Sequence, residues 1–185
     1  MMKGEYRYLF EQNAGQFNLE YLGNDDTRIA NKKRYLWHVQ HSAQINQDLS
    51  FYLDATEISD DNYLNDFGSD FAGRADTHLY RVAQLDYDNE NWTAQLRTED
   101  YELIGDYRSP YRTLPQLSID YNTGDFTGFS ASLYNELTYF QNQVQTREYA
   151  TRAHIEPSIQ YRFEKPAFDT EAELSYLYTR YWQES

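Results

Sequence analysis

The stretch from residue 150 to residue 163 alternates between apolar and polar side chains along its whole length. A period of two residues is that of a β-strand, whose successive side chains point to opposite faces of a sheet. A strand that crosses a membrane needs roughly 9–11 residues, more than the average strand of about 5–6. The pattern therefore predicts a long strand with two chemically different faces. One face carries Ala153, Ile155, Pro157, Ile159, Tyr161 and Phe163, and the other carries Arg152, His154, Glu156, Ser158, Gln160 and Arg162.

The same alternation recurs along the rest of the chain. Each repeat is bounded by polar turn residues, which is the pattern of separate strands. Together the repeats predict about ten strands by this template. The other predicted strands lie at 5–12, 17–21, 35–40, 49–56, 84–87, 92–97, 116–121, 129–138 and 171–178.

Short and long connections alternate between these strands. The short turns are "NAG" at 13, "QINQD" at 44, "DNEN" at 88, "NTGD" at 122 and "EKPA" at 164. The long connections start at 23, 59, 104 and 140. This order predicts an all-β fold, an antiparallel up-and-down meander with tight turns at one edge and long loops at the other. Outer-membrane barrels have this arrangement, with short periplasmic turns and longer extracellular loops.

Composition narrows the classes of protein further. A formal net charge of -14 argues against nucleic-acid binding, which needs a basic face. An aromatic content of 17% argues against disorder, and the absence of cysteine excludes disulfides and zinc–thiolate sites. Two architectures remain: a transmembrane barrel with its apolar face toward lipid, or a soluble all-β carbohydrate- or ligand-binding domain with that face inward. Aromatic side chains gathered near the strand ends favour the barrel.

The barrel interpretation assigns side chains to two environments. A polar lumen and a lipid-facing exterior alternate along each strand of such a barrel. We predict that the lumen-facing side chains include Asp54, Gln95, Arg97, Glu136, Arg152, His154 and Glu156. We predict that the lipid-facing side chains include Leu49, Phe51, Leu53, Ile155, Ile159 and Tyr161.

The longest predicted connection, residues 59–76, is rich in aspartate. A helix–loop–helix calcium site needs oxygen ligands at alternate positions and a glycine at the sixth. Placing Gly68 sixth puts Tyr63 first, and starting at Asp60 puts Leu64 fifth, so this motif is absent. Two interpretations remain: a looser divalent-cation site, or a solvated loop tip. The candidate ligands are Asp60, Asp61, Asp66 and Asp70, whereas Tyr63, Leu64, Phe67 and Phe71 should fold back over the barrel mouth or a neighbouring loop while the aspartates face water.

Two further features need an explanation. His154 and Glu156 share a face, but without a nucleophile motif or phosphate loop they predict no catalysis and no cofactor. Pro157 lies within a predicted strand, where it removes a ladder donor. A bulge that sets curvature, or a local break in pairing that shapes the wall, would accommodate it.

Ordered strings along the chain resemble the barrel region of the LptD family of LPS-assembly proteins. The similarity runs from about Glu5 to Trp182, nearly the whole chain, and is carried by several strings in the same order. These are "FNLEYLGNDD" (17–26), "RYLWHVQHSAQINQDLSFYLDATEISD" (34–60), "ISDDNYLNDFGSD" (58–70), "NENWTAQLRTEDYELI" (89–104), "SPYRTLPQL" (109–117) and "RAHIEP" (152–157).

The resemblance implies a large transmembrane β-barrel of about twenty-six strands in the bacterial outer membrane. In that family a periplasmic jellyroll precedes the barrel, the lipoprotein LptE sits in the lumen, and lipopolysaccharide arrives over a periplasmic LptA bridge. The family inserts lipopolysaccharide into the outer leaflet among the outer-membrane lipids and is not an enzyme.

The chain departs from that pattern in having no signal peptide, no jellyroll, no cysteine and a terminal "YWQES". We therefore expect residues 1–185 to form one partial barrel domain, an internal fragment without the remaining strands and without the family's lateral gate.

Overall fold

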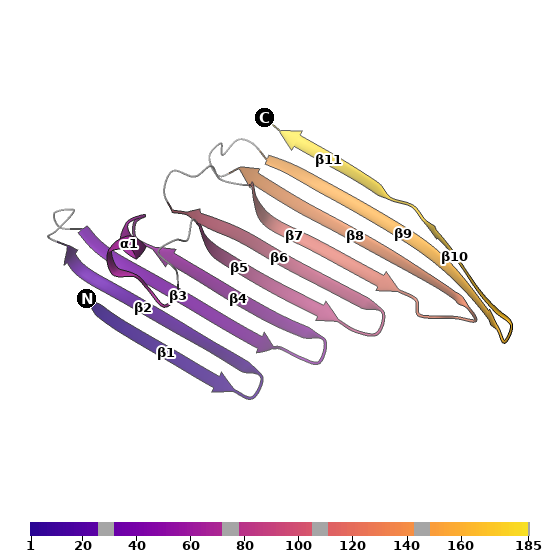
Figure 1. The fold of residues 1–185 in the computed structure, drawn as a ribbon, viewed down its shortest axis with the longest axis horizontal. Helices are drawn as coiled ribbons and strands as arrows, with labels where there is room; N and C mark the ends of the chain where they lie inside the picture. The colour runs from indigo at the N-terminus through magenta and orange to yellow at the C-terminus, as the bar shows by residue number, and fades with distance from the viewer. Residues whose placement is uncertain (26–31, 72–77, 105–110, 143–148, 185) are drawn as a thin grey trace.

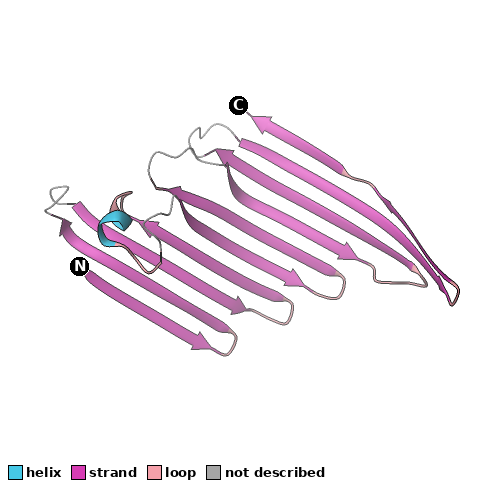
Figure 2. Cartoon of the chain, viewed as in Figure 1, coloured by secondary structure: helices cyan, strands magenta, loops and turns pink. Residues whose placement is uncertain are grey.

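One open antiparallel sheet contains every strand that the structure describes (Figures 1 and 2). The computed structural model describes residues 1–25, 32–71, 78–104, 111–142 and 149–184. Neighbours in sequence are neighbours in the sheet from β1 to β10, and β11 also pairs with β9. The elements are β1 (Met2–Phe10), β2 (Asn13–Asp25), β3 (Lys32–Gln44), β4 (Leu49–Ile58), α1 (Tyr63–Phe67), β5 (His78–Asp88), β6 (Trp92–Leu103), β7 (Tyr111–Asn122), β8 (Phe129–Asn142), β9 (Tyr149–Lys165), β10 (Phe168–Ser175) and β11 (Tyr178–Glu184).

The predicted meander is confirmed, and the described short turns lie at the edge of the sheet opposite α1. The strand that ends at Ile58 and the strand that begins at His78 are joined by the long connection that the sequence predicts. The long connections at 26–31, 105–110 and 143–148 lie outside the described residues. Among the described residues, no helix has the length and apolar character needed to cross a membrane.

The first hairpin differs from the prediction. β1 ends at Phe10 and the turn is formed by residues 11 and 12, so "NAG" belongs to β2 and is not a turn. Gly15 stays in the strand because the ring of Tyr8 lies across it, where a Cβ atom would collide with the phenol. The Tyr8 hydroxyl then hydrogen-bonds Nδ1 of His41 on β3. The glycine provides space for a cross-strand aromatic contact, and the chain turns two residues earlier.

Two other connections also differ from their predictions. The "NTGD" turn extends to Gly128, and the positive φ angles of Thr127 (55°) and Gly128 (88°) shape it. The single strand predicted at 171–178 is interrupted after Ser175 and resumes as β11 at Tyr178. Both parts pair with the same long strand, so the sheet has the width of about ten strands although eleven are formed.

Residues 59–71 fold onto the sheet above β3 and β4, as Figure 1 shows for α1. Tyr63 and Leu64 are fully or almost fully buried, at 0% and 2% exposed. The segment folds back as predicted, but these side chains pack on strands β3, β4 and β5 and not on a neighbouring loop. Packing removes their apolar surface from water, which stabilises the segment. The cluster consists of Leu36, Ile58, Tyr63, Leu64 and Leu79, with Phe67, Phe71 and Ile104 packed at its edge.

Candidate functional site

The strand register divides the side chains of the sheet into two faces. Directly opposed residues share a face, and the ladder opposes Gln95 to Ser118, Ser118 to Glu136, and Glu136 to His154. We call this side the polar face. Following the register across all strands, every predicted lumen-facing residue lies on it: Asp54, Gln95, Arg97, Glu136, Arg152, His154 and Glu156.

The opposite side, which we call the apolar face, contains the predicted lipid-facing residues. Leu49, Phe51 and Leu53 are opposed to Tyr87, Leu85 and Ala83 of β5, and the register continues through β6, β7 and β8 to β9. There it reaches Ile155, Ile159 and Tyr161. The sheet therefore separates the two predicted sets onto opposite faces, and the assignment of one face to a lumen and the other to lipid stays a prediction.

Burial is the reverse of that in a water-soluble sheet. On β8, Glu136 and Thr138 of the polar face are 9% and 1% exposed, whereas Leu137 between them is 49% exposed. On β9, Ile159 of the apolar face is 57% exposed. Soluble proteins bury apolar side chains and expose charged ones. On β8, therefore, polar side chains are covered and the apolar side chain between them is open.

Hydrogen bonds between side chains explain how the polar face stays covered. The Glu136 carboxylate accepts from Thr138 Oγ1 at 2.7 Å, from Tyr134 Oη at 3.0 Å and from Arg152 Nε at 3.0 Å. Arg152 Nη2 also pairs with the same carboxylate. A buried carboxylate is tolerated only when it is paired and hydrogen-bonded in this way. A hollow of about 340 Å³ adjoins the pair, lined by Tyr134, Glu136, Arg152, His154, Thr179 and Tyr181.

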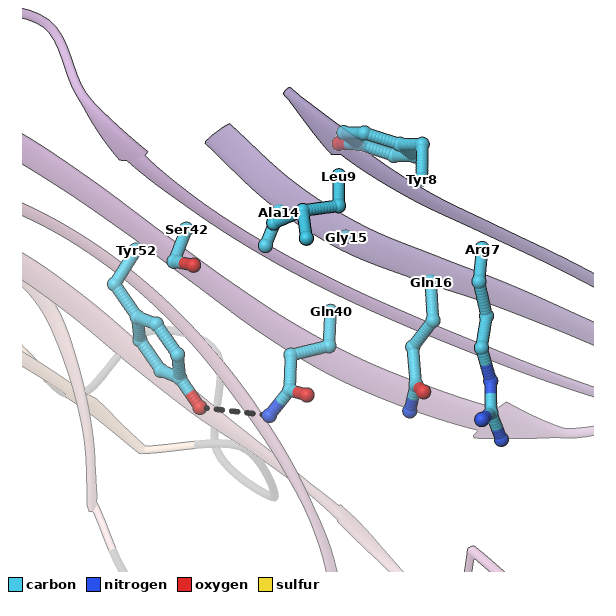
Figure 3. A pocket seen from close by; sticks show the side chains of 9 residues that line it. All are labelled: Arg7, Tyr8, Leu9, Ala14, Gly15, Gln16, Gln40, Ser42 and Tyr52. Atoms are coloured by element: carbon cyan, nitrogen blue, oxygen red, sulfur yellow. Dashed lines mark hydrogen bonds between the residues drawn. The ribbon is translucent and has the colours of Figure 1, made fainter. Parts of the chain in front are cut away.

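A second hollow, of about 580 Å³, lies on the polar face near the short turns of β1 to β4 (Figure 3). Gln40 Nε2 donates to Tyr52 Oη at 3.3 Å and to the Asp54 carboxylate at 3.2 Å. The hollow combines neutral hydrogen-bonding side chains, such as Gln16, Gln40 and Ser42, with apolar surface. The lining residues are Arg7, Tyr8, Leu9, Ala14, Gly15, Gln16, Gln40, Ser42 and Tyr52.

At the other end of the polar face, Arg34 binds three carboxylates. Its Nη1 lies 2.8 Å from both Asp25 Oδ2 and Asp66 Oδ2. Its Nε and Nη2 donate to the two oxygens of Asp60, each at 2.9 Å. Arg34 is 3% exposed, and its guanidinium lies 4.7 Å from the ring centre of Phe67. This cluster, which we call the Arg34 cluster, ties the 59–71 segment to β2 and β3.

Further contacts hold the same segment to the sheet. The Tyr63 hydroxyl donates to Glu20 at 2.9 Å, and Lys3 Nζ binds the other oxygen of that carboxylate at 2.8 Å. Burial and the hydrogen bond to Glu20 raise the pKa of the Tyr63 hydroxyl above its ordinary value. The Phe71 ring stacks on His38 with centroids 4.9 Å apart. The segment thus reaches across β3 to β2, whose Glu20 also binds Lys3 of β1.

The prediction that the aspartates of this segment face water is wrong for two of the four. Asp60 and Asp66 are bound to Arg34, whereas Asp61 and Asp70 lie on the exposed side. In the described part of the chain, no three His, Cys, Asp or Glu side chains lie in a group that could hold a metal ion. The sequence reasoning missed Arg34 because its partners are separated from it by 9 to 32 residues, and no local motif joins them.

The remaining candidates have structural partners. His154 Nδ1 hydrogen-bonds Thr179 Oγ1 at 2.7 Å, and its Nε2 lies 3.6 Å from the Glu156 carboxylate. Pro157 is paired with Leu133 in a continuous register, so the predicted bulge is wrong. The pairing is broken on the other side of β9, opposite residues 176 and 177.

Comparison with known proteins relates most of the chain to one protein family. The LptD family model, described as LPS transport system D, matches residues 32–185. An LPS-assembly protein LptD of Pseudoalteromonas atlantica is 39% identical over 183 residues, covering 99% of this chain and 24% of that protein. A protein of the same name from Shewanella frigidimarina is 37% identical over 185 residues, again 99% of this chain and 24% of the relative. The chain spans about a quarter of the length of these curated relatives.

Proposed function

Because the chain belongs to the LptD family, we propose that it forms part of the wall of a transmembrane β-barrel that inserts lipopolysaccharide into the outer leaflet of the bacterial outer membrane. The polar face lines the lumen in this proposal, and the apolar face contacts lipid. Residues 1–185 form one partial barrel domain of the longer protein.

The pattern of burial on β8 carries this proposal. Leu137 is half exposed between two buried polar residues, Glu136 and Thr138. An apolar face open to water would be unfavourable, but the same face is favourable against lipid chains. Side chains on the inner surface of a curved wall converge and cover one another, which fits the buried network around Glu136.

The open edges of the sheet support a place within a larger barrel. β1 is paired on one side by β2, and its residues are almost all exposed. At the other end all eight residues of β10 are exposed. Unpaired strand edges are unstable in lipid because their backbone groups lack partners, and closure into a barrel removes them.

A soluble binding domain is the alternative that the sequence allowed. It would require Leu49, Phe51 and Leu53 to point into a packed core. These residues keep part of their surface exposed, and the apolar cluster under α1 does not include them. The geometry therefore favours a barrel wall over a soluble binding domain.

The partners follow from the same proposal. Lipopolysaccharide is the transported substrate, and the lipoprotein LptE occupies the lumen of the complete barrel. An LptA bridge delivers the lipid through a periplasmic domain outside this chain. The proposed activity is transport, in which the polar side chains line the lumen and do not catalyse a reaction. No cofactor is part of the proposal.

Site-directed spin labelling tests the two environments directly. A nitroxide would be placed at Leu137, or at Ser118 as the matched polar-face control, in the full-length protein reconstituted in lipid. The label at 137 should relax strongly with oxygen, which dissolves in lipid, and weakly with a water-soluble nickel complex. The label at 118 should show the opposite order. A label at 137 that is shielded from both agents would indicate a packed core and overturn the barrel wall.

Transport itself needs a cellular measurement. Depletion of the full-length protein should stop newly made lipopolysaccharide from reaching the cell surface, while its synthesis continues. Surface arrival can be followed by a modifying enzyme that acts only in the outer leaflet. Unchanged arrival in depleted cells would remove the transport function but leave the membrane architecture standing.

A further inference from the structure

Pro157 lies at the midpoint of β9, the longest strand of the sheet. It is the ninth of 17 residues in Tyr149–Lys165. A proline has no backbone N–H, so it is normally confined to edge strands, strand starts or bulges. The surroundings of Pro157 match none of these, because β9 has neighbours on both sides.

The side of β9 that faces β8 is undisturbed. Opposed residues run from Phe129↔Tyr161 to Gln141↔Tyr149, and Leu133↔Pro157 lies within that series without a shift. The β8 side therefore holds β9 straight through the proline, and any weakness must lie on the other side.

On the other side of β9, two separate strands pair with consecutive parts of it. β10 pairs with β9 up to Ser175↔Ser158, and β11 resumes with Tyr178↔Ile155. The two registers are the same, so no residue has been inserted and the gap is not a bulge. Residues 176 and 177 lie opposite Pro157 and Glu156 but form no regular strand.

Backbone chemistry explains the gap. Tyr176 N donates to the Pro157 carbonyl at 3.0 Å. In an antiparallel hydrogen-bonded pair the two residues exchange both bonds. Pro157 cannot return the second bond to the Tyr176 carbonyl, because it lacks the donor. The side chains add no cover, since Tyr176 and Leu177 are 63% and 61% exposed.

We propose that Pro157, Tyr176 and Leu177 form a hinge at mid-height in the sheet. At these residues the pairing with β9 is lost and the strand bends. β10 and β11 then move as two separate rigid segments, while β9 stays paired with β8. This goes beyond the transport role, because it assigns a conformational device to a defined point. It holds whatever cargo the barrel carries.

Hydrogen exchange in the full-length protein in detergent tests the hinge. Amides of residues 175–178 should exchange about tenfold faster than those of 170–174 and 179–182 on the same line, because a lost hydrogen bond lowers the local opening free energy. Pro157→Val restores the donor and should slow exchange at 175–178 by a similar factor. Ile159→Val is the matched control, since it places the same side chain on the same face two residues away, and it should change nothing.

Uniformly fast exchange along β10 and β11 would show an unprotected edge and overturn a localised hinge. Uniformly slow exchange would overturn it as well. Both outcomes are read from the parent protein, so the proposal stays testable if Pro157→Val fails to fold. If the variant folds and exchange at 175–178 is unchanged, the proline is not the cause and the hinge as proposed is wrong.

Discussion

Arg34 shows how a single side chain positions a whole segment. It binds three carboxylates, one from strand β2 and two from the 59–71 segment, and it is almost completely buried. Its charge can be buried because Asp25, Asp60 and Asp66 neutralise it and occupy its donors. Asp25 is itself 5% exposed, so it depends on Arg34 in turn.

At the residue scale we predict that Arg34→Ala releases the 59–71 segment. Removing one partner of a buried ion pair costs roughly 3–5 kcal/mol, because the remaining charges lack a partner. Limited proteolysis of the full-length protein should then cut within 59–71. Arg7→Ala is the control, since Arg7 lies in an exposed pair with Glu5, and it should leave the segment protected. Equal protection in both variants would mean that apolar packing alone holds the segment.

At the element scale, α1 is held to the sheet by the apolar side chains on one of its faces. Leu64 packs on Leu36, Ile58 and Leu79, while Asn65 next to it is exposed. Leu64→Asp places a charge in that cluster and should cost more than about 3 kcal/mol there. We predict that the strands still pair, seen as an unchanged heat-modifiable band, but that cells become more sensitive to large antibiotics. Asn65→Asp should behave like the parent. Normal sensitivity with Leu64→Asp would show that the segment does not close the barrel mouth.

At the scale of the whole molecule, the proposed barrel and the alternation of connections together assign the strand ends to the two sides of the membrane. Asn65 lies in a long connection, and Ile45, 56% exposed, lies in a short turn at the opposite edge. We predict that Asn65→Cys in the full-length protein reacts on whole cells with a membrane-impermeant thiol reagent. Ile45→Cys should react only after the outer membrane is broken, with the parent protein as background. The reverse order of labelling would invert the topology.

The sequence by itself determined the elements and their faces. Polar and apolar side chains alternate with period two, and successive side chains of a strand point to opposite faces of the sheet. Both faces, the meander and the long 59–76 connection could therefore be predicted. Local sequence could also indicate that Tyr63 and Leu64 fold back, because apolar side chains avoid water wherever they are placed. It could not indicate on what they would pack.

Only the tertiary structure decided the contacts between distant segments. Arg34 meets Asp25, Asp60 and Asp66 because three parts of the chain converge, and no local pattern records that convergence. The sequence predicts a turn at Gly15, but this residue lies in a strand with the ring of Tyr8 across it. Pro157 suggested a bulge, yet the β8 ladder keeps its register and the break falls on the β10–β11 side. The free energy of strand pairing depends on which residue lies opposite a proline that lacks a donor or a glycine that leaves space. The opposed residue is set only when the sheet forms.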